Sequence, residues 1–83
     1  MDKNKILRIG RYILYHYTFI ENDGKPDECY TFAQEQPSGT KDTKDKFLHA
    51  DGVFLYPQNW KVPYYRTLEA IITAFKKFQQ EKQ

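Results

Sequence analysis

The chain contains one cysteine and two histidines, the side chains that most often serve as nucleophile and base. A thiolate is the reactive form of cysteine, and a nearby imidazolium lowers the pKa of a thiol. Cys29 with His16 or His49 is therefore the pair that could perform nucleophilic catalysis. No glycine-flanked serine, paired-carboxylate motif or Walker loop accompanies them in the sequence. We expect Cys29 to be a small buried thiol, and we expect a protein that is not an enzyme and has no catalytic residues.

The same inventory bears on metals and cofactors. Zinc sites use three or four ligands, commonly Cys and His in close pairs. One Cys and two His without such pairing do not supply them. Residues 39–41, Gly-Thr-Lys, resemble part of a phosphate-binding loop but lack the upstream glycine. We therefore expect neither a metal nor a cofactor.

Aromatic and basic side chains are interleaved near the start of the chain and suggest binding instead. Such groups can stack on nucleobases and contact phosphates, and Tyr, Trp and Arg are also enriched in protein interfaces. The formal net charge of +2 is too small to favour nucleic acid over protein. We expect a partner-binding surface that includes Arg8, Arg11, Tyr12, Tyr15, Tyr17 and Trp60.

The expected partner is another protein, and the expected function is that of an inhibitor or adaptor. A second copy of the chain, forming a homodimer, would satisfy the same surface, and single-stranded nucleic acid is the alternative ligand. The abundance of Lys, Ile, Tyr and Phe is what AT-rich coding gives, and small chains without motifs are frequent in phages and mobile elements. This association favours a host enzyme or defence complex as the target.

The length of 83 residues corresponds to a single domain, residues 1–83, with a thin core. Hydrophobic residues form 40% of the chain, and the counts of Tyr 7 and Phe 6 indicate a core built largely from rings. A single cysteine excludes an internal disulfide and fits a reducing compartment, so we expect a cytoplasmic protein. Charged residues interrupt the apolar segment 6–20, which therefore fits neither a signal peptide nor a membrane span.

Three segments predict the first part of a sheet. Residues 6–20 are apolar or aromatic on both alternating faces and predict one long strand. Residues 21–26 combine Asn, Asp, Gly and Pro and predict a hairpin turn. Residues 27–36 alternate as a half-buried second strand does. A single helix can cover only one face of this sheet, so we expect the other face to bind a partner.

The next two segments predict a loop and a hairpin. Residues 37–46 carry alternating charges without an apolar side chain to anchor them, which is typical of a mobile loop. Residues 47–56 resume apolar character around Asp51-Gly52, a strong signal for a two-residue hairpin turn. The alternative is one strand with a glycine bulge.

The last segment predicts an amphipathic helix. Pro63 can occupy the first turn of a helix, where its missing N–H costs nothing. Apolar residues then recur at spacings of three and four, as on the buried face of a helix: Leu68, Ile71, Ile72, Phe75 and Phe78. The whole pattern predicts an α+β fold, a small antiparallel sheet of three to four strands with one C-terminal helix packed on one face.

Overall fold

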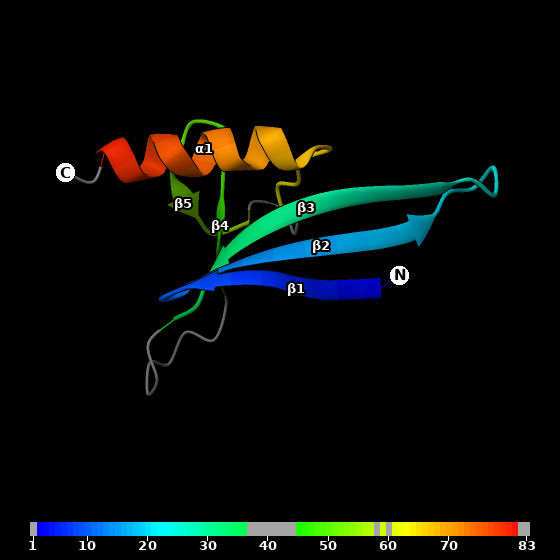
Figure 1. The fold of residues 1–83 in the computed structure, drawn as a ribbon, viewed down its shortest axis with the longest axis horizontal. Helices are drawn as coiled ribbons and strands as arrows, with labels where there is room; N and C mark the ends of the chain where they lie inside the picture. The colour runs from blue at the N-terminus through cyan, green and yellow to red at the C-terminus, as the bar shows by residue number, and fades with distance from the viewer. Residues whose placement is uncertain (1, 37–44, 58, 60, 82–83) are drawn as a thin grey trace.

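A computed structural model describes residues 2–36, 45–57, 59 and 61–81, and it confirms the α+β fold. The sheet is antiparallel, with strand order β1-β2-β3-β4-β5 and a helix, α1, on one face (Figure 1). It has five strands, where three to four were expected. The elements are β1 (Asp2–Ile9), β2 (Tyr12–Ile20), β3 (Pro26–Gln34), β4 (Lys46–Leu48), β5 (Phe54–Leu55) and α1 (Leu68–Glu81).

The extra strand arises because residues 6–20 are not one strand. The chain reverses at Gly10 and Arg11, and Ile9 pairs with Tyr12 across this two-residue turn. Gly10 has φ +59°, and a glycine at the first central position is what a type II′ hairpin turn needs. The prediction of a single strand was wrong because apolar residues continue on both sides of the turn.

The two other hairpins are confirmed, with one difference. β2 and β3 pair along their whole length, from Tyr12 with Gln34 to Ile20 with Pro26. β4 and β5 also pair as two strands, so the alternative of one bulged strand is wrong. Their connection spans residues 49–53 rather than two residues. Within it the His49 amide donates to the Val53 carbonyl and the Gly52 amide to the His49 carbonyl, each at 2.9 Å. The predicted loop 37–46 falls mostly on residues 37–44, outside the described part of the chain.

The helix begins later than Pro63. Tyr65 lies between Pro63 and α1, and its amide and carbonyl both bond to the backbone of Tyr30 in β3 at 2.8 Å. The Thr67 hydroxyl then accepts a hydrogen bond from the Ala70 amide at 3.1 Å, which is the geometry of an N-cap. α1 therefore starts at Leu68, and the expectation that Pro63 lies in its first turn was wrong.

The core lies between α1 and the adjacent face of the sheet, which we call the helix face. Phe32 stacks on Phe75 with ring centroids 4.3 Å apart and planes 8° apart. The buried members of this core are Leu14, Phe32, Leu48, Phe54, Ile71, Ala74 and Phe75. Leu68 was expected on the buried helix face but is 44% exposed.

The opposite face of the sheet, the helix-free face, is covered over part of its length. Ile13 and Ala33, at its inner end, are each 1% exposed. Farther out, the β2–β3 hairpin extends past the end of α1 (Figure 1), and Tyr15, Tyr17 and Phe19 are only half-buried. The uncovered face is therefore real but smaller than the sequence predicted.

Candidate functional site

The structure does not place the six predicted binding residues on one face. Tyr15 and Tyr17 lie on the helix-free face, in the same alternating set as the buried Ile13. Tyr12 points to the helix face, and its ring centroid lies 4.9 Å from that of Phe54. The centroids of Phe75 and Phe78 also lie within 5.9 Å of it. Tyr12 is thus a core residue in the free chain.

The other predicted residues are Arg8, Arg11 and Trp60. Arg8 pairs with Ile13 and therefore also lies on the helix-free face, close to the β1–β2 turn, and Arg11 lies in that turn; both are exposed. Trp60 falls outside the described residues. Of the six, the structure therefore brings together Arg8, Tyr15 and Tyr17 on the helix-free face, with Arg11 beside Arg8 at the turn.

The first surface, which we call the tyrosine face, comprises Lys3, Lys5, Tyr15, Tyr17 and Phe19. Lys3 pairs with Tyr17 and Lys5 with Tyr15 across β1 and β2, so these side chains share a face. The Lys3 ammonium lies 4.2 Å from the Tyr15 ring centroid, a cation–π contact, and the two tyrosine centroids are 6.4 Å apart. Two neighbouring strands thus place two rings and two cations on one surface.

The arginines at the β1–β2 turn are held by Glu35. The Arg8 guanidinium donates two hydrogen bonds to the Glu35 carboxylate, at 2.8 and 2.9 Å. Arg11 donates to the Glu35 carbonyl at 3.2 and 3.0 Å. The hydrogen bond from Arg8 lowers the pKa of Glu35. Both arginines therefore already have acceptors, and a phosphate would have to displace them.

Acidic side chains lie at the outer end of β3. Asp27 accepts a hydrogen bond from Arg66, which precedes α1. The pKa of Asp27 is lowered by three hydrogen bonds: one shared with Glu21, one from the backbone amide of Glu28 and one from the Arg66 guanidinium. The same contact with Asp27 raises the pKa of Glu21. This end of the sheet thus carries carboxylates beside the tyrosine face.

The possible catalytic residues do not come together. Cys29 pairs with Tyr17 and lies on the helix-free face, whereas His16 pairs with Tyr30 and belongs to the opposite set. Burial raises the pKa of the Cys29 thiol, which disfavours the thiolate. His16 instead contacts Glu28 at 3.1 Å and stacks on Tyr30 with centroids 4.8 Å apart. Within the described ranges, no three His, Cys, Asp or Glu side chains are grouped as metal ligands.

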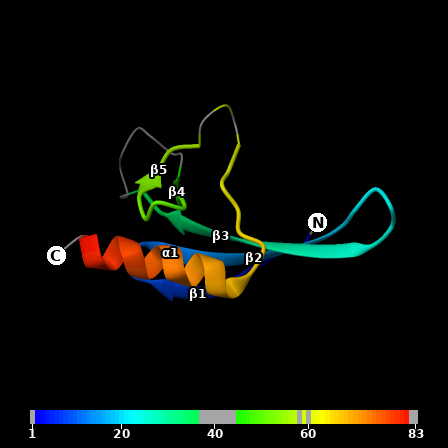
Figure 2. The same cartoon turned by 90° about the horizontal axis from the view of Figure 1, so that it is seen from above.

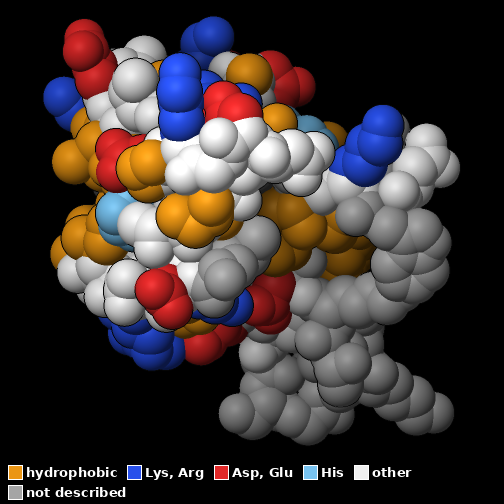
Figure 3. Space-filling model, turned by 90° about the vertical axis from the view of Figure 1, so that its right-hand side faces the viewer, with side chains coloured by type: hydrophobic (Ala, Val, Ile, Leu, Met, Phe, Trp, Pro, Cys, Tyr) orange, Lys and Arg blue, Asp and Glu red, His pale blue; other side chains and the backbone are white. Residues whose placement is uncertain are grey.

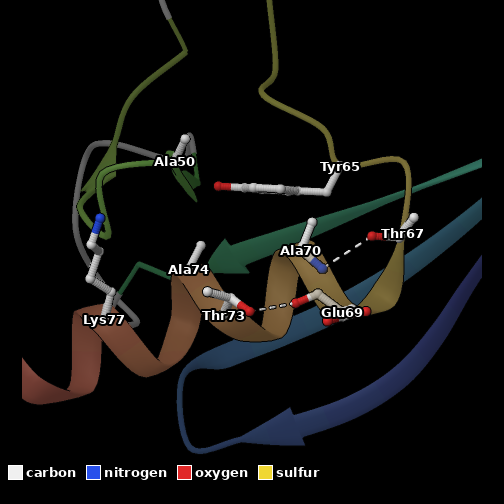
Figure 4. A pocket seen from close by; sticks show the side chains of 8 residues that line it. All are labelled: Ala50, Tyr65, Thr67, Glu69, Ala70, Thr73, Ala74 and Lys77. Atoms are coloured by element: carbon white, nitrogen blue, oxygen red, sulfur yellow. Dashed lines mark hydrogen bonds between the residues drawn. The ribbon is translucent and has the colours of Figure 1, made fainter.

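A surface depression of about 560 Å³ lies between α1 and the loop before β5 (Figure 4). Its hydroxyl groups serve the fold: Tyr65 donates to the Leu48 carbonyl at 3.0 Å, and Thr73 donates to the Glu69 carbonyl at 2.9 Å. The Thr67 hydroxyl is the helix cap. None of these contacts indicates a ligand.

A second exposed surface was missed by the sequence reasoning. Leu7 and Ile9 pair with Leu14 and Tyr12, so they lie on the helix face, yet they are 41% and 42% exposed. Figure 2 shows that β1 runs along one side of α1, with β4 and β5 on the other side. Thr73 and Lys77 of α1 line the depression, on the β4–β5 side of the helix. The helical period places Leu68 and Ile72 on the opposite side of α1, which is the side nearer β1. We call Leu7, Ile9, Leu68 and Ile72 the apolar strip.

The chain was also compared with known proteins. No protein-family model, no curated protein and no solved structure matches it. Helix α1, with 14 residues, is shorter than a bilayer crossing requires, and the described residues contain no helix that could span a membrane. Function must therefore be argued from the surfaces themselves.

Proposed function

We propose that this protein is a non-enzymatic binding module that docks onto another protein through its tyrosine face. One observation carries the proposal: Tyr15 and Tyr17 lie side by side and half-buried on the face of the sheet opposite α1. Tyrosine rings supply a large apolar contact area at low entropic cost, and a β-sheet holds them rigidly. A partner that covers Tyr15 and Tyr17 would bury the ring surface that remains exposed in the free chain.

The charges support a protein partner over single-stranded nucleic acid. Phosphate contacts dominate nucleic-acid affinity and require available cations. Arg8 and Arg11 are engaged by Glu35, which leaves Lys3 and Lys5 as the two cations beside the tyrosines. Two lysines supply few phosphate contacts, and Asp27, which pairs with Phe19, adds a carboxylate at the outer end of the tyrosine face. Viewed from the tip of the β2–β3 hairpin, the surface shows separate hydrophobic patches with charges of both signs between them (Figure 3). Such a mixed surface is typical of a protein interface.

A chain of 83 residues that acts through such a surface works by occupying its partner or by joining two partners. A protein that occupies its partner is an inhibitor, and one that joins two partners is an adaptor. We propose inhibition of a larger protein, such as a host enzyme or defence complex, because a single rigid face is enough for it.

The test is capture of the partner from source cells by the full chain and by a variant of the proposed site. Tyr15→Ser with Tyr17→Ser removes both rings from the face. Tyr64→Ser is the matched control, because it removes a tyrosine that is 58% exposed but lies on the segment before α1. We expect one protein to be retained by the wild type and by Tyr64→Ser, and to be lost with the double variant.

The captured protein is then purified and its affinity measured at two salt concentrations. Truncating a central aromatic typically costs about 2 kcal/mol or more, so the double variant should bind at least about 30-fold more weakly. The wild-type affinity should fall only modestly as salt rises, because the tyrosine face carries two lysines, Lys3 and Lys5. Retention of the partner by the double variant, or tight oligonucleotide binding that falls steeply with salt, would refute the proposal.

A further inference from the structure

The strand at the edge of the sheet, β1, has an open side. It is the first strand in the order β1-β2-β3-β4-β5, and all eight of its residues are exposed. Eight extended residues span about 27 Å, and no other strand among the described residues pairs with their outer side. An edge of this length is a template for another strand unless side chains prevent pairing.

The side chains of β1 select which strand can pair. Lys3, Lys5 and Arg8 are cationic and Asp2 is the one carboxylate, so a second copy of β1 would meet an edge of the same positive sign. Arg8 is neutralised by Glu35, whereas Lys5 forms no ion pair with any other described residue. Carboxylates opposite the two lysines would be attracted instead.

The other end of β1 offers apolar contacts. Leu7 and Ile9 are exposed on the helix face, and Leu68 and Ile72 lie on the β1 side of α1. A strand laid beside β1 would place its alternate side chains over the apolar strip. Polar side chains there would leave the strip uncovered, so apolar ones are required.

We infer that β1 accepts an extended segment of the partner protein as an added antiparallel strand, acidic opposite Lys3 and Lys5 and apolar opposite Leu7 and Ile9. This inference rests on the proposed function and specifies the chemistry of the partner. The two surfaces adjoin, because Lys3 and Lys5 pair with Tyr17 and Tyr15. A partner on the tyrosine face can therefore reach the edge.

The test uses the full chain, labelled with nitrogen-15, and a capped eight-residue peptide. The peptide has valine at positions 2 and 4 and glutamate at positions 5 and 7, which places the valines opposite Ile9 and Leu7 and the glutamates opposite Lys5 and Lys3 in an antiparallel pairing with the register shift that β2 also shows. A second peptide has lysine for glutamate, and a third is N-methylated along one edge so that it cannot extend the sheet. We expect saturable amide shifts and slowed hydrogen exchange in β1 with the glutamate peptide alone.

Charge reversal in the protein checks the same contact. Lys3→Glu with Lys5→Glu should weaken the glutamate peptide about tenfold and strengthen the lysine peptide. Lys76→Glu with Lys77→Glu makes the same change in net charge on the helix and should leave both affinities unchanged.

Three results would overturn the inference. One is equal binding of the glutamate and lysine peptides, or of the N-methylated peptide. Another is the lack of saturable shifts in β1. The third is a dimer in sedimentation whose β1 amides are already protected, since a second copy would then be the occupant. If the peptides fail while capture of the partner still depends on Tyr15 and Tyr17, the edge inference alone is lost and the proposed function stands.

Discussion

Substitution of Gly52 tests how closely the β4–β5 hairpin packs against α1. Gly52 has φ +85°, and a Cβ built on it would lie 3.1 Å from the Cβ of Lys77 and 3.1 Å from the backbone nitrogen of Phe78. Replacing Gly52 with alanine therefore imposes two costs. A left-handed backbone costs an L-residue about 1–2 kcal/mol, and crowding against a packed helix costs about 1–3 kcal/mol.

Gly24 provides the matched control. It has nearly the same φ, +82°, but an added Cβ there would meet no atom within 4 Å. Gly24→Ala should therefore lose about 1–2 kcal/mol from strain alone. Gly52→Ala should lose about 2–5 kcal/mol. The loss of unfolded-state entropy on changing Gly to Ala, about 0.4–1 kcal/mol, is common to both variants and cancels in the comparison.

Urea unfolding followed by circular dichroism measures both free energies. The chain is small, and its total stability is of the order of 4–12 kcal/mol. A difference of about 1 kcal/mol between the variants also shifts the melting temperature by about 4–8 °C. If Gly52→Ala costs no more than Gly24→Ala, the close approach of the hairpin to α1 is wrong.

Three further predictions concern single contacts. Burial raises the pKa of Tyr65 to about 12, so its contribution to stability is complete below the usual tyrosine pKa of about 10 and is lost as the pH rises from there towards 12. Tyr65→Phe lacks the hydrogen bond to Leu48 and should be about 1 kcal/mol less stable than the wild type at neutral pH. Between neutral and alkaline pH the variant should lose less stability than the wild type does, as urea unfolding at both pH values will show. Thr67→Ala should cost about 1 kcal/mol by removing the helix cap, whereas Thr73→Ala, inside α1, should be close to neutral in the same assay. The pKa of Glu35 is lowered, so its stabilising contact with Arg8 is fully present above the usual glutamate pKa of about 4.3. The contact is lost as the pH falls through the lower pKa of the folded state. Carbon-13 NMR should therefore show Glu35 titrating below the usual glutamate pKa in the wild type and close to it in Arg8→Met.

Much of the fold was predictable because local signals agreed with the packing. The turn at residues 21–26 and the spacing of Ile71, Phe75 and Phe78 each follow from a rule that needs no tertiary information. The start of α1 was not predictable in this way. The backbone of Tyr65 pairs with that of Tyr30, which lies 35 positions earlier, and this pairing keeps Tyr65 out of the helix. No local sequence pattern predicts a pairing over that distance.

The candidate site was predictable only in part, for a related reason. The turn at Gly10 lies inside an apolar run, so alternation alone could not separate β1 from β2. Recognising Gly10-Arg11 as a turn would have placed Leu7 and Ile9 beside Leu14 and Tyr12 and revealed the exposed edge. Strand alternation already put Tyr12 on the face opposite Tyr15, and the structure shows that this face is the core.

The central claim is that the tyrosine face is open in the free chain and covered in the complex. Photochemically induced nuclear polarisation reports which tyrosine rings a dye in solution can reach. Tyr15 and Tyr17 should give signals in the free chain and lose them when the captured partner is added, while Tyr64 keeps its signal throughout. Signals from Tyr15 and Tyr17 that persist in the complex, or that are missing from the free monomer, would contradict the account.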